Sequence, residues 1–481
     1  MRAYGGLDIG TDGVRLVVVD QALELLFAEG LSYQTNSPRP GWAEQNPAEI
    51  YSACINLLRK MVERFPAHQL YLTFSSVMHS LLGVDQAGQE LTPLIIWADT
   101  RSRGKRDDLE KKYGKELFYQ HTACPLHSAY WPARLIWLKE YFQQDFFRYI
   151  SIKEYLIFKL TGQWMTDYSL ASSSGIFNLE QVEYDREILR IAGVDPEQLS
   201  PVFSPTESFS FQINGKLITG LIGAADGVLA NLGVGAVASN QSVLTVGSSS
   251  AVRFISERPV LDAENRVWCY MLEQDFYVIG EATNGAGVLL KWLADIFGYQ
   301  RVSELLADNL RAIPYQENGL ICIPTMIAER GPNYNEDLKG LFYGLSLNHS
   351  RQDIVTAVYE SIAFFLKMVY DDVKRVNGQE PGSITMTGRL GLSEKFMEFT
   401  EYLIGQVSYI PGYQQNTAVG AAMLGVKMVE GLTYQAMLKN LPSRQTGDFV
   451  LNQSFQEQLA NKYRRFKRVY HRISLDSHFY R

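Results

Sequence analysis

Apolar residues recur with two different spacings along this chain of 481 residues. Short β-branched runs predict strands, whereas apolar positions three or four residues apart predict helices. The expected strands are 7–9, 14–20, 69–76, 217–222, 242–246, 251–255 and 384–387. The expected helices are 47–64, 101–113, 151–161, one beginning at Asp226, 285–297, 300–312, 351–376, 392–405, 416–430 and a C-terminal helix. Alternation of the two kinds predicts an α/β fold.

A weak internal repeat divides the chain. The segments LDIGTDGVRLV and LTVGSSSAVRFI both place a glycine after an apolar strand and a Val-Arg pair soon after it. The repeat predicts two similar lobes with a boundary near 236–241, hence domains 1–238 and 239–481. In the first segment, Asp12-Gly13 between apolar runs favours a tight hairpin turn, which needs positive φ at both positions.

The charge balance argues against a nucleic-acid partner. The formal net charge is −7, with 46% hydrophobic and 20% charged residues, so there is no overall basic excess. One basic run, 462–472, overlaps apolar residues at three- or four-residue steps: Phe455, Leu459, Tyr463, Phe466 and Tyr470. This pattern predicts an amphipathic helix with a solvated basic face rather than a nucleic-acid patch.

The cysteines and the apolar runs bear on location. The four cysteines, 54, 124, 269 and 322, are far apart in sequence and form no CxxC motif, which fits a reducing compartment and no cysteine metal site. The N-terminal residues show no apolar signal region, and no apolar run reaches the roughly 18 residues that a membrane span needs. We therefore expect a cytoplasmic protein with no membrane partner.

The stretch TGLIGAADGVLANLGVG (219–235) is the most informative for chemistry. It places Asp226 among small residues, where a helix begins. A helix N-terminus favours an ionised carboxylate, and small neighbours leave room for a substrate. The alternative is an ordinary helix N-cap aspartate.

Three glycine turns follow predicted strands, at Gly10, Gly247 and Gly388. Backbone N–H groups at such turns can bind phosphate oxygens, and glycine allows close approach. There is no GxxxxGK[ST] motif and no GxGxxG opening a helix, which disfavours P-loop and dinucleotide folds. Together with Asp226, the three turns favour a nucleotide site.

The order of several motifs resembles the FGGY family of carbohydrate kinases and, within it, the gluconokinases. The motifs are LDIGT (7–11), GWAEQNP (41–47), FSSVMHSLLGVD (74–85), IIWADTRS (95–102), SIKEYLIFKL (151–160), DYSLASSSG (167–175), IGAADGVLANLGV (222–234), NGAGVLLKWL (284–293), ERGP (329–332) and AVGAAMLG (418–425). The resemblance implies two ribonuclease H-like (actin/hexokinase-type) lobes around a nucleotide cleft. It also implies phosphorylation of D-gluconate to 6-phosphogluconate with ATP and Mg²⁺.

The resemblance also implies roles for residues. Asp226 is the expected general base and Asp8 the expected magnesium-orienting residue. The expected substrate-binding residues are Met78, His79, Trp97, Arg101, Asp226 and Gly227, with His127 as a weaker candidate. The expected nucleotide-binding residues are Gly10, Thr11, Asp12, Gly13, Arg15, Gly247, Ser248, Gly287, Lys291, Gly388, Arg389 and Ser393. Arg101 has two readings: a cation for an aldonate carboxylate, or one half of an ion pair with Asp99 that braces its loop.

The chain departs from the family pattern in its expected nucleotide-binding turns. Asp12-Gly13 replaces the usual Thr-Ser, Ser250 replaces a glycine, and Arg389 replaces the second glycine of a pair. A carboxylate about 4 Å from a phosphate charge costs about 4 kcal/mol at an effective dielectric of 20, unless Asp12 turns away or a metal bridges the charges. Arg389 either blocks the adenine position or stacks on the base.

Three functions are therefore compared: a gluconokinase, a xylulokinase or other polyol kinase of the same family, and a catalytically weak, sugar-binding regulatory homologue. The small-molecule partners are a sugar or sugar acid and ATP. A homodimer is compatible with the sequence, which does not fix the oligomeric state.

Overall fold

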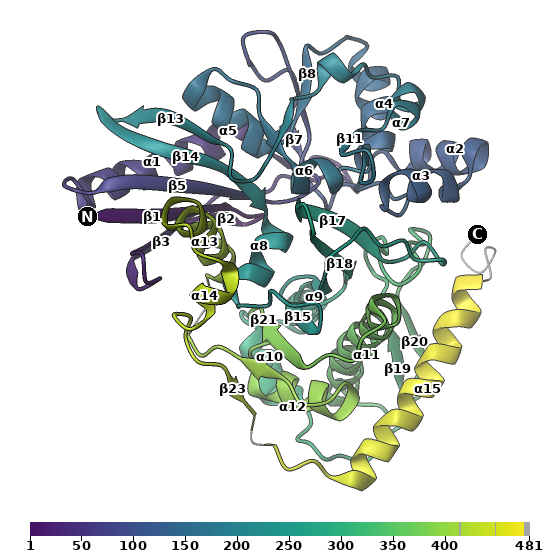
Figure 1. Cartoon of the computed structure of the whole chain (residues 1–481). Coiled ribbons are helices and arrows are strands. Elements are labelled where there is room, and N and C mark those ends of the chain that lie inside the picture. The colour runs from purple at the N-terminus through teal and green to yellow at the C-terminus, as the bar shows by residue number, and fades with distance from the viewer. Residues whose placement is uncertain (413–414, 448, 476–481) are drawn as a thin grey trace. The chain divides into compact units, whose positions relative to one another are not determined.

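The computed structural model describes residues 1–412, 415–447 and 449–475 (Figure 1). The chain forms two compact units. Unit 1 comprises 1–238, 255–279 and 415–442, and unit 2 comprises 239–254, 280–414 and 443–481. The domains expected from the sequence, 1–238 and 239–481, share the junction at 238/239 but leave 255–279 and 415–442 with the second domain.

Unit 1 is built on a six-stranded sheet with the order β13-β14-β5-β1-β2-β3. Its strands are β1 (Arg2–Ile9), β2 (Gly13–Val19), β3 (Leu25–Ser32), β5 (Gln69–Ser76), β13 (Ser208–Ile213) and β14 (Lys216–Ala225). Strands β1, β5 and β14 are parallel, and the other three pair antiparallel to their neighbours. The central strands are buried along almost their whole length, as expected of a sheet covered on both faces.

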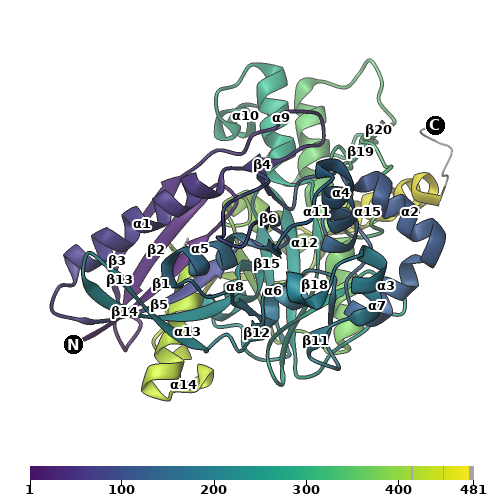
Figure 2. The same cartoon turned by 90° about the horizontal axis from the view of Figure 1, so that it is seen from above.

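Two helices pack on this sheet, α1 (Pro47–Arg64) and α13 (Asn416–Glu430), and Figure 2 shows them on opposite faces. Helix α1 begins where the sequence predicted, because Asn46 caps it and Pro47 occupies its first turn. Helix α13 lies so close to β1 that a Cβ on Gly6 would sit 1.8 Å from the carbonyl oxygen of Ala418. Only glycine permits this approach.

The other elements of unit 1 are mostly short. Its remaining helices are α2 (Arg103–Tyr113), α3 (Lys115–Thr122), α4 (Trp131–Phe142), α5 (Ile152–Thr161), α6 (Tyr168–Ser172), α7 (Arg186–Ala192), a 3₁₀ turn (Pro196–Gln198), α8 (Asp226–Gly233) and α14 (Tyr434–Leu438). Its short strands are β4 (Glu44–Gln45), β6 (Leu82–Val84), β7 (Leu94–Ile95), β8 (Arg148–Ile150), β9 (Thr166–Asp167), β10 (Phe177–Asn178), β11 (Glu183–Tyr184) and β12 (Val202–Phe203). Strand β17 (Trp268–Glu273) precedes β18 (Phe276–Thr283), along which the chain passes into unit 2.

Unit 2 repeats the arrangement of unit 1 at its centre. Strand β15 (Gln241–Val246) pairs antiparallel with β16 (Ser250–Ser256) and parallel with β21 (Ser383–Thr387), as β1 pairs with β2 and β5. Strands β22 (Ser408–Tyr409) and β23 (Gln445–Thr446) follow β21 in the sheet, and β19 (Ile321–Ile323) pairs with β20 (Leu341–Tyr343). The helices are α9 (Gly287–Phe297), α10 (Val302–Asn309), α11 (Arg351–Asn377), α12 (Glu394–Leu403) and α15 (Gln453–Leu475).

The predicted helices and strands are present, and the predicted repeat corresponds to two matching sets of three strands. Helix α1 and strand β5 have the predicted bounds, whereas α9, α10 and α12 begin two residues later than expected. Helices α3 and α4 and strands β17 and β18 were not predicted. Helix α4 is buried on much of its surface, so its sequence lacks a clear polar face from which to read a helical period.

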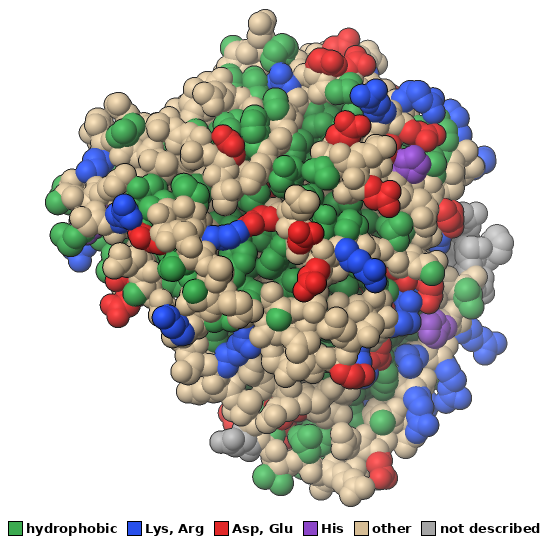
Figure 3. Space-filling model, viewed as in Figure 1, with side chains coloured by type: hydrophobic (Ala, Val, Ile, Leu, Met, Phe, Trp, Pro, Cys, Tyr) green, Lys and Arg blue, Asp and Glu red, His purple; other side chains and the backbone are tan. Residues whose placement is uncertain are grey.

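The C-terminal helix α15 has the predicted amphipathic character. All five apolar residues named for it are buried, from Phe455 to Tyr470. Lys and Arg side chains gather over this helix in Figure 3. An open surface hollow there is lined by Asn461, Arg464, Arg465, Lys467, Arg468 and His471. Lys462 is the exception to the solvated face, because it is buried and pairs with Glu360 at 2.6 Å.

Candidate functional site

The carboxylate of Asp8 lies at the C-terminal end of β1. The strand register aligns Asp8 with Ser75 on β5, and Ser75 with Ala224 on β14. The Ser75 hydroxyl donates to Asp8 Oδ1 at 3.0 Å, and Arg15 Nη1 lies 3.8 Å from Oδ2. Burial raises the pKa of Asp8, while Ser75 and Arg15 oppose that rise. The carboxylate is thus fixed in place but only partly compensated by charge.

Asp226 is the first residue of α8, two residues beyond the row that contains Asp8. Its side chain is half-buried, and Oδ1 accepts the N–H of Gly227 at 2.7 Å. The N-cap is Ala225, whose side chain has no polar atom, so the N-cap alternative for Asp226 is wrong. Helix α8 lies very close to α13: a Cβ on Gly420 would be 2.1 Å from the Leu229 carbonyl oxygen.

A bulge in β14 precedes Asp226. The register against β5 shifts between Leu221 and Ala224, and Gly223 between them has a φ of 72°. A Cβ on Gly223 would also lie 1.8 Å from the Phe74 carbonyl oxygen. Bulges commonly redirect a side chain next to a functional site, and here the bulge sets the direction in which the chain enters α8.

The loop between β1 and β2 is held by side chains. Trp97 Nε1 donates to Thr11 Oγ1 at 2.9 Å, and Gln45 Nε2 donates to the Thr11 carbonyl at 2.6 Å. Tyr33 donates to the Gly10 carbonyl. Trp97, predicted as a substrate residue, therefore also anchors the loop predicted to bind phosphate.

The predicted tight Asp-Gly turn is wrong. Asp12 does not have positive φ, and the N–H of Gly10 bonds the carbonyl of Gly13 at 3.0 Å across a longer loop. Gly13 is required for a different reason: a Cβ there would lie 2.5 Å from the Leu31 carbonyl oxygen on β3. Asp12 is exposed at this loop.

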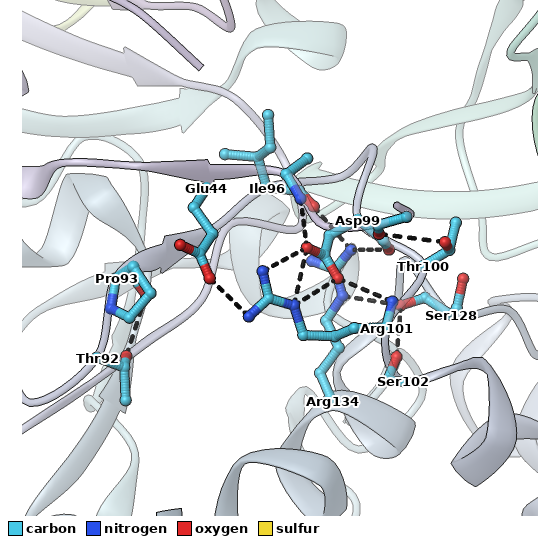
Figure 4. Close-up of polar contacts among 12 residues, drawn as sticks. Glu44, Thr92, Pro93, Ile96, Asp99, Thr100, Arg101, Ser102, Ser128 and Arg134 are labelled. Carbon is cyan, nitrogen blue, oxygen red and sulfur yellow. Dashed lines mark hydrogen bonds and ion pairs between the residues drawn. The ribbon is translucent and has the colours of Figure 1, made fainter. Parts of the chain in front are cut away.

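Arg101 is enclosed by partners, as Figure 4 shows. Its Nε and Nη2 donate to both carboxylate oxygens of Asp99 at 2.7–2.9 Å, and Nη1 lies 2.7 Å from Glu44. The guanidinium also stacks 3.7 Å from the ring centroid of Trp42. Only 2% of the side chain is exposed. These contacts favour the bracing role of Arg101 over the binding of a substrate carboxylate.

A second buried arginine, Arg134, ties the same loop to its surroundings. Its guanidinium donates to the carbonyl oxygens of Ser128, His79, Ile96 and Asp99 at 2.6–3.1 Å. No motif in the sequence singles out Arg134. Its position inside a helix that had not been predicted gave no sign of this role.

His79 has strained backbone geometry, with a φ of 64°. Residues outside glycine rarely adopt this conformation, and such strain is often found at functional sites. The His79 ring lies 4.8 Å from that of Tyr130 and 6.4 Å from that of Tyr270, and the two tyrosine hydroxyls are 2.9 Å apart. Tyr270 belongs to 255–279, the segment that joins unit 1 from the later part of the chain.

The other predicted substrate residues differ in their surroundings. Met78, half-buried, packs on the apolar cluster that includes Ala225 and Val228, and Gly227 is buried in the first turn of α8. His127 is 2% exposed, and its Nδ1 accepts the Ala129 N–H at 3.0 Å. That bond stabilises the local turn.

In unit 2, the turn after β15 lies against the N-terminus of α9. The N–H of Gly287 donates to the Gly247 carbonyl at 2.9 Å, and that of Val288 donates to the Ser248 carbonyl at 3.2 Å. A Cβ on Gly287 would lie 2.6 Å from the Gly247 oxygen, whereas one on Gly247 would meet nothing within 4 Å. Gly287 is thus required for packing, and Gly247 leaves open space beside the turn.

Ser250 is accommodated without strain. It begins β16, does not have positive φ, and its hydroxyl lies 2.7 Å from that of Thr283. Lys291, further along α9, is mostly exposed and pairs with Asp295 at 3.1 Å. The Lys291 ammonium is therefore at the surface, one turn beyond the start of the helix.

The turn after β21 contacts the end of β15. Gly388 has a φ of 84°, and a Cβ there would lie 2.5 Å from the Val246 carbonyl oxygen. That oxygen accepts the N–H groups of Leu390 and Gly391, both at 3.0 Å. Ser393 is the N-cap residue of α12, but its hydroxyl donates to the Leu390 carbonyl at 2.8 Å. Arg389 follows Gly388 and is exposed.

The described residues bear on metal binding and on membranes. Asp8 supplies one carboxylate, which fits Mg²⁺, because this ion is commonly bound through one or two carboxylates together with substrate phosphates. Within the described ranges, no group of three or more His, Cys, Asp and Glu side chains is placed to hold a metal alone. No described helix is both long and apolar enough to cross a membrane.

Comparison with known proteins identifies the fold and the family. The model of the FGGY carbohydrate kinase N-terminal domain matches residues 3–233, and the C-terminal domain model matches 242–429. The chain is 31% identical to a gluconokinase of Bacillus subtilis over 445 residues, covering 88% of this chain and 86% of that protein. It is 24% identical to a xylulose kinase of Staphylococcus xylosus, covering 87% and 89%.

Among solved structures, gluconate kinase from Lactobacillus acidophilus superposes with a TM-score of 0.88 at 25% identity, covering 99% of both chains. Ligand-bound xylulose kinase from the same organism gives 0.87 at 25% identity, covering 100% of this chain and 99% of the other. The two-domain α/β fold is therefore that of the actin- and hexokinase-like sugar kinases, and the chain belongs to the FGGY family of carbohydrate kinases.

Proposed function

We propose that the chain transfers the γ-phosphoryl group of ATP to the terminal hydroxyl of D-gluconate, forming 6-phosphogluconate. The main support is the carboxylate of Asp226, half-buried at the start of α8 and next to the N–H of Gly227. Similarity to gluconokinases at 30–31% identity, against 24–25% for the xylulose kinases, favours gluconate as the substrate.

In this proposal Asp226 acts as the general base. Its carboxylate takes the proton of the sugar hydroxyl as that oxygen bonds to the γ-phosphorus and the bond from phosphorus to ADP breaks. Phosphoryl transfer depends mostly on positioning and charge stabilisation. The close packing of α8 against α13 and the hydrogen bond from the Gly227 N–H to Asp226 serve that positioning.

The nucleotide phosphates are assigned to the backbone turns that begin at Gly10, Gly247 and Gly388. Backbone N–H groups bind anionic oxygens without adding a side chain, and Arg15 supplies a nearby cation. Asp8 is the residue assigned to Mg²⁺, which neutralises phosphate charge when bound with ATP. Ser248, Arg389 and Ser393 remain assigned to the nucleotide. Gly287 is also assigned to it, because it packs against the turn at Gly247.

Sugar recognition is assigned to His79, Met78, Trp97 and Gly227. His79 is the basic side chain favoured for an aldonate carboxylate, because the guanidinium of Arg101 is already enclosed by Asp99, Glu44 and Trp42. Tyr130 and Tyr270 add aromatic faces and hydroxyls beside His79.

Two other functions are alternatives to the proposed gluconokinase activity. A xylulokinase is favoured by the similarity to xylulose kinases, including a ligand-bound one. A weak, sugar-binding homologue is favoured by the exposed carboxylate of Asp12 in the first phosphate turn.

The deciding experiment measures ADP formation with Mg²⁺-ATP and D-gluconate, beside D-xylulose, glycerol and a blank without sugar. Calorimetric titration of each sugar accompanies the assay. Turnover selective for gluconate is the expected result. Selective turnover of xylulose contradicts the substrate assignment, and gluconate binding without any turnover supports the regulatory alternative.

A further inference from the structure

A fully buried ion pair in unit 1 connects helix α5 with the N-terminus of helix α6. Lys153 Nζ lies 2.6 Å from Oδ2 of Asp167, the N-cap residue of α6, and neither side chain is exposed. Removing two charges from water costs about as much as their attraction returns, so such a pair is weak evidence for a stabilising role. Its role is better explained by the groups that Asp167 holds in place.

The two carboxylate oxygens of Asp167 have different partners. Oδ2 faces Lys153, whereas Oδ1 accepts the N–H of Ser169 at 2.9 Å and also the Ser169 hydroxyl. The single hydroxyl proton of Ser169 is therefore directed toward Asp167. The hydroxyl oxygen keeps its lone pairs for another donor.

That donor is the N–H of Ala225, which lies 2.6 Å from Ser169 Oγ. Ala225 is the N-cap of α8 and directly precedes Asp226. The bond to Ser169 fixes the peptide between Ala224 and Ala225, which comes one peptide before the start of the helix. A displacement of that peptide would be passed through Ala225 to Asp226.

We propose that Lys153, Asp167 and Ser169 form a positioning relay that orients Asp226 for proton abstraction. The proposal rests on the assignment of Asp226 as the base of a sugar kinase. Lys153 anchors Asp167, Asp167 directs the hydroxyl of Ser169, and Ser169 holds the peptide of Ala225. None of the three is assigned a contact with either substrate.

The charges around Lys153 are consistent with this relay. Burial lowers the pKa of Lys153, and the carboxylates of Asp167, Glu154 and Asp226 oppose that effect. Asp226 therefore interacts electrostatically with the anchoring cation, in addition to the hydrogen-bonded connection through Ala225.

The test removes the central hydroxyl with Ser169→Ala. We expect kcat to fall about tenfold while the KM values for sugar and ATP stay within about twofold, as for loss of an interaction that acts in the transition state. Ser169→Thr keeps the hydroxyl and should recover most of the lost kcat. Ser173→Ala is the matched control, since Ser173 is buried on the same segment but donates to the Leu170 carbonyl.

A double-mutant cycle with Asp226→Asn separates positioning from general stability. If Ser169 acts through Asp226, Ser169→Ala should have no further effect on the residual turnover of the Asp226→Asn variant. An equal loss in both backgrounds, an unchanged kcat, or a similar loss in Ser173→Ala would overturn the relay. Retention of full turnover by Asp226→Asn alone would instead overturn the proposed base.

Amide exchange gives a readout that does not depend on turnover. The N–H of Ala225 should exchange slowly in the wild type and in Ser173→Ala, and faster in Ser169→Ala. Lys153→Met should increase exchange at the same peptide, because Asp167 loses its anchor. Unchanged protection of Ala225 in both Ser169→Ala and Lys153→Met would refute the relay even if no sugar is turned over.

Discussion

Unit 1 and unit 2 share a strand arrangement but place different groups at the ends of their central strands. In unit 1, Asp8 lies between Ser75 and Arg15; in unit 2, Thr245 lies 2.8 Å from the Thr387 hydroxyl and accepts from Arg253 at 3.0 Å. The same geometry thus carries a carboxylate in one unit and a neutral hydroxyl in the other.

The turns that follow these strands differ as well. Unit 1 relies on side chains such as Trp97 and Gln45 to hold its loop, whereas unit 2 relies on backbone bonds at Gly247 and Gly388. Neutral backbone suits the binding of an anion, because it adds no like charge. Fixed carboxylates suit proton transfer and cation binding, so the difference favours unit 1 for the proposed base and magnesium residues, while the turns of unit 2 suit phosphate contacts alone.

The largest expected effect comes from removing the charge of the Asp226 carboxylate in unit 1. Asp226→Asn should lower kcat on the order of a thousandfold, because general-base catalysis contributes about 10²–10⁴, while sugar binding stays nearly unchanged. Steady-state kinetics and calorimetric titration of the sugar measure the two quantities. A variant with most of its turnover would remove Asp226 from the chemistry.

The next effect tests the backbone turn of unit 2. Gly388→Ala places a Cβ against the Val246 carbonyl at a positive φ, so the turn must move. We expect the KM for ATP to rise about tenfold, equivalent to about 1.4 kcal/mol, with sugar binding unchanged. Gly378→Ala is the control, because Gly378 also has positive φ but a Cβ there meets nothing within 4 Å; an equal effect would contradict the argument from contact.

A third prediction concerns Glu329, a buried carboxylate of unit 2 that accepts hydrogen bonds from Tyr470 and from the N–H of Asn335. Burial raises its pKa to about 8, although Tyr470 and the N–H of Asn335 oppose the rise. A raised pKa in the folded state gives stability that is complete below the unfolded pKa and is lost as pH rises through about 8.

Wild-type protein should therefore lose about 3 kcal/mol more stability than Glu329→Gln between about pH 6 and about pH 9. Thermal unfolding at both pH values measures this difference. An equal decline of Tm in both proteins would show that Glu329 does not titrate in this range.

The smallest effect is expected at Asp12. If Asp12 faces the phosphates, Asp12→Thr should tighten ATP binding several-fold, since a repulsive charge is removed. Titration with ATP at two salt concentrations checks it, because screening weakens the effect at an exposed residue. Unchanged or weaker binding would indicate that the side chain turns away or that a metal bridges the charges.

The alternation of elements, the repeat and the family can all be read from the sequence alone. These follow from local information: periodicity identifies helices and strands, and the motif order identifies FGGY kinases. Asp226 was found as a lone carboxylate among small residues where a helix begins, whereas Asp8 was found through the resemblance to the family. Their assigned roles await the experiments above.

The partners of the candidate site residues, in contrast, became known only from the three-dimensional structure. Ser169 meets Ala225 across 56 residues of sequence, and Arg101 meets Glu44 and Trp42 from other segments. The structure also showed that Gly13 begins β2 and packs closely against β3, so that Asp12 and Gly13 do not form the tight turn expected from the sequence. Such contacts depend on strand register and close packing between distant segments, which local patterns do not encode.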